Sequence, residues 1–380
     1  MRKVILAFWK DTLEETFTDL SANVNELLGF LSKPEKKFNV VVMPDYFMDR
    51  LMNLDLDTQA FCSMITDIVQ RKGGSVDKIL QVDQRGGNSV NVASALLALG
   101  VNVTPILCTS KLGLEQIRFF FKQYNVDLSH IKTFSEASMT TALEFASESG
   151  KSNVMLRNLG SLASFGPADL AEADYEAVDK ADYVCLFNWA GTKEYGTALA
   201  ERVFARAKRG SCKTYLDTAD PLPNKEGIPE LMERVLVGNQ VDVLSVNENE
   251  AVTYASQLSN KVEESRGKVE FNELALLSAQ ILAKHLHARI DLHTTTFAAT
   301  VTKERAFLVP AFKIAALRAT GAGDAWDAGN LIGDAGGLSP EARLCLANAV
   351  AACYLSSGDG VHPDRQTLIR FLKKHKVANS

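Results

Sequence analysis

The loop Thr320-Gly321-Ala322-Gly323-Asp324 joins small residues to one carboxylate at the start of a helix-like segment. Small residues let successive backbone N–H groups turn toward one point, and the positive end of the helix dipole adds to their attraction for an anion. We therefore predict that Gly321, Ala322 and Gly323 form an anion hole with Asp324 at its rim. A carboxylate beside such a hole suits a reaction in which a hydroxyl loses its proton while negative charge builds on a phosphoryl group.

A tight turn ahead of a helix is the simpler alternative for this loop, because Asp is common in the first turn of helices for dipole reasons alone. Two other phosphate-binding motifs are excluded by the residues present. The loop cannot extend to Gly-x-Gly-x-x-Gly, because position 326 is Trp. The segment Gly150-Lys151-Ser152 lacks the first glycine of a P-loop, because position 145 is Phe.

Three further polar motifs precede the loop along the chain. Asp45 and Asp49 follow the apolar run 40–44, and a double glycine opens the segment Gly86-Gly87-Asn88-Ser89-Val90-Asn91. The third motif, Asn247-Glu248-Asn249-Glu250, follows a β-branched run at 241–244. In residue type, order and separation, these motifs and the 320–329 segment resemble the signatures of the ribokinase-like (PfkB) family of carbohydrate and nucleoside kinases. The resemblance covers roughly residues 38 to 375.

The resemblance implies an α/β fold, a three-layer αβα sandwich with a mostly parallel central sheet and a small β lid. It also implies the transfer of a phosphoryl group from ATP to a hydroxyl of a sugar or nucleoside. Asp324 would take or align the proton of that hydroxyl. The backbone amides of Ala322, Gly323 and Asp324 would neutralise charge on the transferring group.

Substrate contacts are expected from the first two motifs. Ligands in open α/β sheets bind outside the carboxyl ends of the strands, where all the motifs would converge. Asp45 and Asp49 offer acceptors for sugar hydroxyls, Gly87 allows close backbone approach, and Asn88 and Asn91 offer amide hydrogen bonds. A strand-end turn and a helix cap are the simpler alternative for these residues.

Nucleotide contacts are expected from later motifs. Asn247 and Glu250 lie one helical turn apart and could hold a hydrated Mg²⁺ through water, with no direct metal ligand; the alternative is an N-cap with a first-turn acid. The family's Thr-x-Gly-x-x-Gly loop aligns with residues 293–298, which lack both glycines, although a threonine such as Thr295 can still contact phosphate. Asn348 matches a position that contacts the nucleotide base, with an ordinary polar helix residue as the alternative.

Several residues depart from the family pattern. Arg318 replaces an Asp that is linked to a monovalent cation site, and because a guanidinium cannot ligate K⁺ we expect no K⁺ activation. Ser110 and Phe47 replace an expected acidic residue and an Asn. Arg157 in the lid region could meet an anionic substrate, with a solvated lid residue as the alternative.

The histidines give only a weak metal signal. His285 and His287 are two residues apart and would lie on different faces of one helix, so the spacing argues against a site that they share with His293. We therefore predict no directly bound metal.

Hydrophobic spacing predicts the elements that position these motifs. From residue 38 onward, short β-branched runs alternate with amphipathic segments, which indicates a parallel sheet with helices on both faces. Residues 131–157 and 50–85 are expected to form the lid: the first contains a hairpin pattern, and the second a helix pattern at Thr58 to Arg71. Residues 1–37 are predicted to be an appended helical extension of the kinase domain at 38–375, from the spacing of Leu20, Val24, Leu27, Leu28 and Leu31.

Composition limits the function. The chain has 380 residues, is 46% hydrophobic and has a net charge of −5 from 41 basic and 46 acidic residues, with no long basic run that would indicate a nucleic-acid binder. It contains no run of 18 apolar residues and no cleavage signal near its start, so we expect a cytoplasmic protein that does not engage a membrane. Its six cysteines lie in apolar runs without Cys-x-x-Cys spacing, which favours reduced, buried thiols.

Three functions remain open from the sequence. The first is an ATP-dependent kinase with Mg²⁺ and a small sugar or nucleoside substrate. The second is the same fold with ADP as donor, because the altered 293–298 loop weakens any inference about the nucleotide. The third is a non-catalytic binding or regulatory protein on a kinase fold. A homodimer through the lids is also open, since family members often pair in that way.

Overall fold

The computed structural model describes residues 20–33, 37–147, 150–318 and 320–378. Its main feature is an eight-stranded sheet in which every strand runs parallel except β13. In sheet order the strands are β14 (Ala306–Pro310), β13 (Phe297–Val301), β12 (Arg289–His293), β11 (Val243–Val246), β10 (Lys213–Asp217), β9 (Tyr183–Phe187), β1 (Asn39–Met43) and β4 (Asn102–Pro105). The prediction of a mostly parallel α/β sheet is confirmed.

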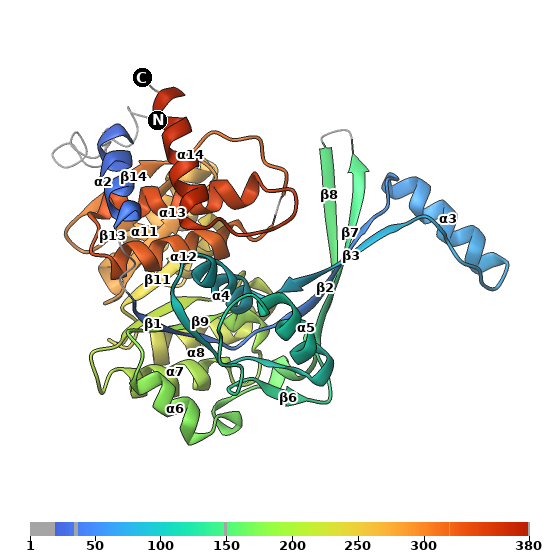
Figure 1. Ribbon diagram of the computed structural model, residues 1–380, viewed down its shortest axis with the longest axis horizontal. Coiled ribbons are helices and arrows are strands. Elements are labelled where there is room, and N and C mark those ends of the chain that lie inside the picture. Colours follow the sequence, from blue (N-terminus) through green and yellow to red (C-terminus); the bar gives the residue numbers. More distant parts are fainter. Residues whose placement is uncertain (1–19, 34–36, 148–149, 319, 379–380) are drawn as a thin grey trace.

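Helices cover both faces of this sheet and complete the three-layer sandwich (Figure 1). One face carries α2 (Leu20–Ser32), α4 (Asn88–Ala98), α5 (Lys111–Phe121), α12 (Ala322–Ala335), α13 (Pro340–Leu355) and α14 (Arg365–Ala378). The other carries α6 (Glu172–Asp179), α7 (Gly196–Ala207), α8 (Ile228–Leu231), α9 (Glu248–Ser256), α10 (Lys261–Ser265) and α11 (Phe271–His285). Short turns connect them: η1 (Gly160–Ser164), η2 (Pro167–Asp169), η3 (Trp189–Gly191), η4 (Leu222–Gly227) and the π-turn η5 (Met232–Leu236).

The central strand β9 is apolar along its whole length, as expected for a strand that is covered on both faces. In β9, Tyr183, Cys185 and Phe187 enter the core beneath α12 and α13, whereas Val184 and Leu186 enter the core beneath α7 and α9. This alternation follows from the two-residue period of a strand. It anchors the carboxyl ends of the strands, where the site residues lie.

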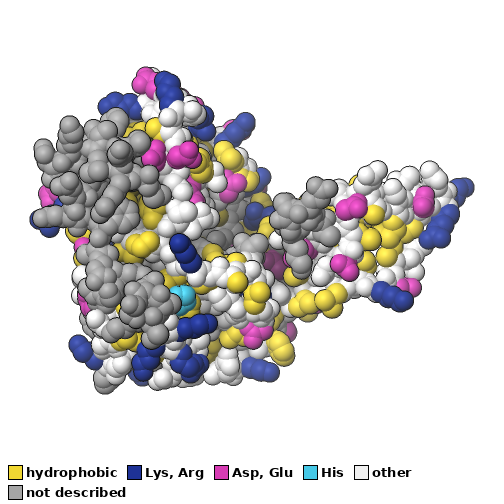
Figure 2. Space-filling model, turned by 90° about the horizontal axis from the view of Figure 1, so that it is seen from above, with side chains coloured by type: hydrophobic (Ala, Val, Ile, Leu, Met, Phe, Trp, Pro, Cys, Tyr) yellow, Lys and Arg dark blue, Asp and Glu magenta, His cyan; other side chains and the backbone are white. Residues whose placement is uncertain are grey.

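A second sheet forms the lid. Its strands, in the order β3 (Leu80–Gly86), β2 (Phe47–Asn53), β7 (Ser138–Ser147) and β8 (Gly150–Asn158), come from the two segments expected to form it. Between β2 and β3, α3 (Thr58–Gln70) projects beyond the sheet (Figure 1) and contains no buried residue. Figure 2 shows the lid and α3 as an arm with hydrophobic side chains on its surface. The expectation of buried thiols is wrong for Cys62, which is exposed on α3.

Two small strands lie near the base of the lid. β5 (Cys108–Ser110) and β6 (Lys132–Phe134) pair in parallel. Ser110 caps α5 by accepting a hydrogen bond from the backbone N–H of Gly113 over 3.2 Å. Ser110 therefore has a local structural role at the position where the family expects an acid.

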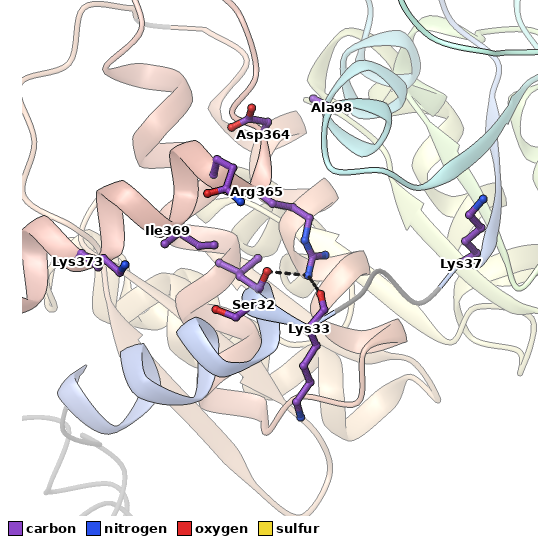
Figure 3. A pocket seen from close by; sticks show the side chains of 10 residues that line it. Ser32, Lys33, Lys37, Ala98, Asp364, Arg365, Ile369 and Lys373 are labelled. Carbon is purple, nitrogen blue, oxygen red and sulfur yellow. Dashed lines mark hydrogen bonds between the residues drawn. The ribbon is translucent and has the colours of Figure 1, made fainter.

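The N-terminal helix α2 packs against the main domain through Val24, Leu27 and Leu31, which are buried in the core with α13 and α14. Residues 1–19 of the predicted extension lie outside the described residues. A pocket of about 970 Å³ lies between α2 and α14 (Figure 3), and its lining contains none of the predicted site residues. There Arg365 ties the two helices together by donating to three carbonyls at the end of α2, those of Phe30, Leu31 and Lys33.

In the part of the chain that the structure describes, no helix has both the length and the apolar character required to cross a membrane.

Candidate active site

The small-residue loop turns into α12 through Gly321, whose φ of +80° lies in the left-handed region. A Cβ at this position would come within 2.9 Å of the Tyr354 ring, so both backbone conformation and space require glycine. The next three residues, Ala322, Gly323 and Asp324, form the first turn of α12, whose N–H groups have no partner within the helix. The loop thus leads into a helix start with backbone N–H groups unpaired within the helix, and the binding of an anion there stays a prediction.

Asp324 lies at this helix start with only 6% of its surface exposed. Its Oδ1 accepts a hydrogen bond from Nδ2 of Asn88 over 2.7 Å, and its Oδ2 accepts one from Nδ2 of Asn91 over 2.9 Å. Burial raises the pKa of Asp324 to about 8, and the nearby carboxylates of Asp217 and Asp45 add to the rise, while the two amide donors act against it. A carboxyl with this pKa can exchange a proton near neutral pH.

The two asparagines thus have a partner within the protein. The sequence predicted that Asn88 and Asn91 would bind the substrate, but their side-chain amides donate to Asp324. Both are on α4, one helical turn apart, so they reach the same carboxyl group. Their contact holds Asp324 in position.

Asp45, which the sequence predicted to accept hydrogen bonds from substrate hydroxyls, already accepts several hydrogen bonds from within the protein. It is fully buried, and its oxygens accept the backbone N–H groups of Asn88 and Ser89 and Nδ2 of Asn188, each over 2.8 Å. The structure shows the alternative that the sequence left open, in which Asp45 caps the start of α4. Gly87 makes this cap possible, because a Cβ there would lie 3.0 Å from Oδ2 of Asp45 at a φ of +98°.

Asp49 is better placed for a ligand. It lines a cavity of about 370 Å³ between the lid and the 320s loop, together with Arg318 and Thr320. Its Oδ1 is buried and has no hydrogen-bond partner among the described residues. Burial raises the pKa of Asp49 to about 6, while a hydrogen bond with Thr140 lowers it in part.

Asn247 and Glu250 form a capping box at the start of α9. Oδ1 of Asn247 accepts the N–H of Glu250 over 3.1 Å, and in return the carboxylate of Glu250 accepts the backbone N–H and Nδ2 of Asn247 over 2.9 and 2.7 Å. This is again the simpler alternative from the sequence. Burial, followed by the charge of Asp217, raises the pKa of Glu250 well above its usual value.

Asn348 does not have a free amide with which to contact a nucleotide base. Its Oδ1 accepts a hydrogen bond from Nε1 of Trp326 over 2.9 Å, and its Nδ2 donates to the carbonyl of Pro310 over 3.1 Å. The amide thereby ties α12, α13 and β14 together, and a contact between Asn348 and a nucleotide base stays a prediction. Thr295 remains exposed, and its backbone N–H donates to Glu248 over 3.0 Å.

The two unusual arginines both lie near the lid. Arg318 donates to Oε1 of Gln84 on β3 over 2.9 Å, and its guanidinium lies 5.4 Å from the centre of the Tyr354 ring. Arg157 is exposed and lies over the ring of Phe47, 4.9 Å from its centre. Arg318 thus brings a permanent positive charge to the flank of the small-residue loop.

Comparison with known proteins identifies the family of the chain. The family model for pfkB family carbohydrate kinases matches residues 61–366. The chain belongs to this family. No curated protein matches the chain.

Solved structures of PfkB-like kinases share the fold at low sequence identity. A fructokinase from Xylella fastidiosa with bound ATP has a TM-score of 0.65 at 16% identity, over 90% of this chain and 99% of its own. A ribokinase from Arabidopsis thaliana complexed with ribose and ATP has a TM-score of 0.63 at 15% identity, over 89% and 99%. A putative ribokinase II from E. coli in complex with ATP and Mg²⁺ has a TM-score of 0.65 at 13% identity, over 90% and 100%.

Three polar residues of this PfkB protein lie near the site but were not predicted from the sequence. Asn188 follows β9 directly and contacts Asp45, Asp217 ends β10, and Asp327 lies one turn beyond Asp324 on α12. A polar residue at the carboxyl end of an apolar strand was the available signal for the first two. Asp327 shares a helix face with Asp324, which the spacing of three residues could have indicated.

Proposed function

We propose that this PfkB protein transfers the terminal phosphoryl group of ATP to a hydroxyl of a sugar or nucleoside, with Asp324 as the base. The observation that carries the proposal is the placement of Asp324. Its carboxyl group lies at the first turn of α12 and accepts hydrogen bonds from the side-chain amides of Asn88 and Asn91. Burial raises the pKa of this group to about 8. It can accept the hydroxyl proton while the loop amides receive the phosphoryl charge.

The acceptor substrate would enter the cavity between the lid and the 320s loop. Asp49 offers a buried carboxylate oxygen without a donor, which is suited to a substrate hydroxyl. Gly86 makes room for this carboxyl group, because a Cβ there would lie 2.0 Å from Oδ2 of Asp49. We keep Asp49 as the substrate-binding carboxylate and assign Asp45, Asn88 and Asn91 to positioning.

ATP is the donor that we propose, because a fructokinase and a ribokinase of similar fold were each solved with bound ATP. In this family, Mg²⁺ would accompany the nucleotide. The oxygens of Asn247 and Glu250 already accept hydrogen bonds from each other's groups, so contact from them to Mg²⁺ would run through water. ADP as donor remains the alternative, because residues 293–298 lack the glycines of the usual nucleotide loop.

A substrate panel tests the proposal. Sugars, sugar phosphates and nucleosides are each combined with ATP or ADP and scored for nucleotide turnover, with the Asp324→Asn variant run in parallel. Turnover with ATP that the variant loses supports the proposal, and turnover with ADP alone selects the alternative donor. No turnover across the panel, together with tight binding of one compound, would reject the kinase function in favour of a binding protein.

A further inference from the structure

A cluster of three potential metal ligands lies beside the small-residue loop. The carboxylates of Asp217 and Asp327 and the imidazole of His293 each bring one ligand atom into a group whose atoms lie within 4.8 Å of one another. The residues come from the ends of β10 and β12 and from α12, so the fold brings together positions far apart in the chain.

Asp327 brings to this cluster a buried carboxylate oxygen that lacks a hydrogen-bond donor in the described part of the chain. It is fully buried, and its Oδ1 accepts hydrogen bonds from the hydroxyls of Tyr215 and Ser245, each over 2.6 Å. Its Oδ2 has no hydrogen-bond donor among the described residues. A buried carboxylate oxygen without a donor is costly, and a bound cation would remove that cost.

His293 supplies a second unpartnered atom. Its Nε2 is buried and makes no hydrogen bond to any described residue. The ring lies against Trp326, with centres 5.0 Å apart and planes at 36°, so its orientation is held by packing. Nε2 is therefore available as a metal ligand, in the way that neutral imidazoles bind metal ions.

The cluster also adjoins the predicted anion hole. Cε1 of His293 lies 3.3 Å from the point that a Cβ on Gly323 would occupy. One oxygen of Asp217 already has a partner: its Oδ1 accepts a hydrogen bond from the backbone N–H of Ala219 over 2.8 Å. A metal ion in the cluster would thus lie next to the loop amides that face an anion.

We propose that Asp217, His293 and Asp327 directly bind one divalent first-row transition ion, such as Mn²⁺, Co²⁺ or Zn²⁺. One imidazole nitrogen and two carboxylates suit these ions, whereas Mg²⁺ prefers an all-oxygen shell with several waters. Three protein ligands leave coordination positions open for water or a phosphate oxygen. This proposal departs from the sequence prediction, in which no metal is bound directly, Mg²⁺ is held through water near Asn247 and Glu250, and the spacing of the histidines argues against a histidine site.

The ion would place positive charge beside the phosphoryl group, and this catalytic consequence rests on the proposed kinase function. It would act next to the 293–298 loop, where the expected glycines are absent. Binding of the ion itself does not depend on that function. The two proposals can therefore fail separately.

Metal binding is tested on the full chain without nucleotide. The protein is freed of metal with a chelator and titrated with MnCl₂, CoCl₂ or MgCl₂ by calorimetry, and the Co²⁺ complex is followed by its visible absorption. We expect one Mn²⁺ or Co²⁺ per chain, at least about tenfold tighter than Mg²⁺. The background carries Cys62→Ser, because this exposed thiol can bind soft metal ions by itself.

His293→Ala is the decisive variant, because His293 lies at the partly exposed end of its strand. We expect it to weaken Mn²⁺ and Co²⁺ binding at least about tenfold and to abolish the Co²⁺ absorption. His287→Ala, which changes an exposed histidine, should leave both unchanged. Asp327→Asn should also weaken binding, with its fold checked by circular dichroism because Tyr215 and Ser245 depend on it.

The outcomes separate the two proposals. Stoichiometric Mn²⁺ binding that His293→Ala loses supports the site even if no substrate is turned over. Absence of stoichiometric binding, or full retention in His293→Ala, overturns it even if the substrate panel shows kinase activity. If Asp217 and Asp327 share a proton and bind no metal, the titration will show this second result, the absence of stoichiometric binding.

Discussion

Asn88 donates its side-chain amide to Oδ1 of Asp324 over 2.7 Å and so joins the start of α4 to the start of α12. The same residue also offers its backbone N–H to Asp45, which caps α4 from the end of β1. One asparagine thus links the buried cap to the proposed base. The position of Asp324 depends on the correct docking of α4.

The first prediction concerns the pKa of Asp324. Asn88→Ala removes a hydrogen bond that favours the charged carboxylate, so the pKa should rise further, by about one unit. The acid limb of the pH profile of kcat/KM should move up by the same amount. Asn102→Ala, which alters an exposed asparagine bonded to Asn39, is the control. An unchanged acid limb in Asn88→Ala would contradict the role given to this contact.

The second prediction is that Asp324→Asn separates rate from binding. The amide keeps the shape of the side chain but cannot accept a proton, so we expect kcat to fall by about 10²–10⁴-fold. The dissociation constant of the acceptor substrate should change little, because Asp49 and the lid remain intact. Single-turnover kinetics and calorimetry measure the two quantities. A near-normal rate in the variant would show that another group moves the proton.

The same substitution should stabilise the protein at high pH. The folded-state pKa of Asp324 is about 8, while an unfolded Asp titrates near about 3.9. Between these values the folded protein holds a proton that the unfolded chain releases, so this group lowers stability as the pH rises through that window. Asp324→Asn removes this loss of stability because the amide does not titrate. The melting temperature of the variant should therefore exceed that of the wild type by more at pH 8 than at pH 5. Asp77→Asn, at an exposed site, should show no such trend.

The sequence predicted the fold correctly because the fold depends on local pattern, and the same kind of pattern singled out Asp324 as the proposed base. Alternating apolar runs and helices specify the sheet, and the small residues before Asp324 allow the tight turn that leads into α12. The hydrogen-bond partners of Asp45 and Asn348 could not be predicted from local pattern. Asn188 donates a hydrogen bond to Asp45, and Trp326 donates one to Asn348. Both donors lie far from their acceptors in the sequence.

The cluster of Asp217, His293 and Asp327 shows the same limit more clearly. No two of these residues have a spacing that indicates a shared site, because the sheet order and the docking of α12 bring them together. Histidine spacing along the chain argued against a metal site and gave no information about contacts across strands. Long-range packing decides which polar side chains remain unpartnered.

The next prediction concerns monovalent cations. Arg318 holds a permanent positive charge beside the loop, where the family's usual Asp would help to bind K⁺. We expect the rate to be the same in KCl and NaCl at equal ionic strength. Arg318→Ala should lower kcat in both salts, because the flank of the loop loses its charge. A large activation of the wild type by K⁺ alone would refute this account.

The last prediction compares two glycines that flank α12, one before its start and one after its end, and that have similar φ angles but different surroundings. Gly321 has a φ of +80° and lies against Tyr354, whereas Gly337 has a φ of +70° and nothing within 4 Å of its missing Cβ. Alanine at either position should cost about 1–2 kcal/mol of unfolding free energy for the left-handed backbone. Gly321→Ala should cost more, because its Cβ meets the Tyr354 ring, and should lower kcat at least about tenfold by displacing the loop amides. Urea unfolding and steady-state kinetics on both variants test this, and equal activity in the two would show that the backbone of the loop does not act in catalysis.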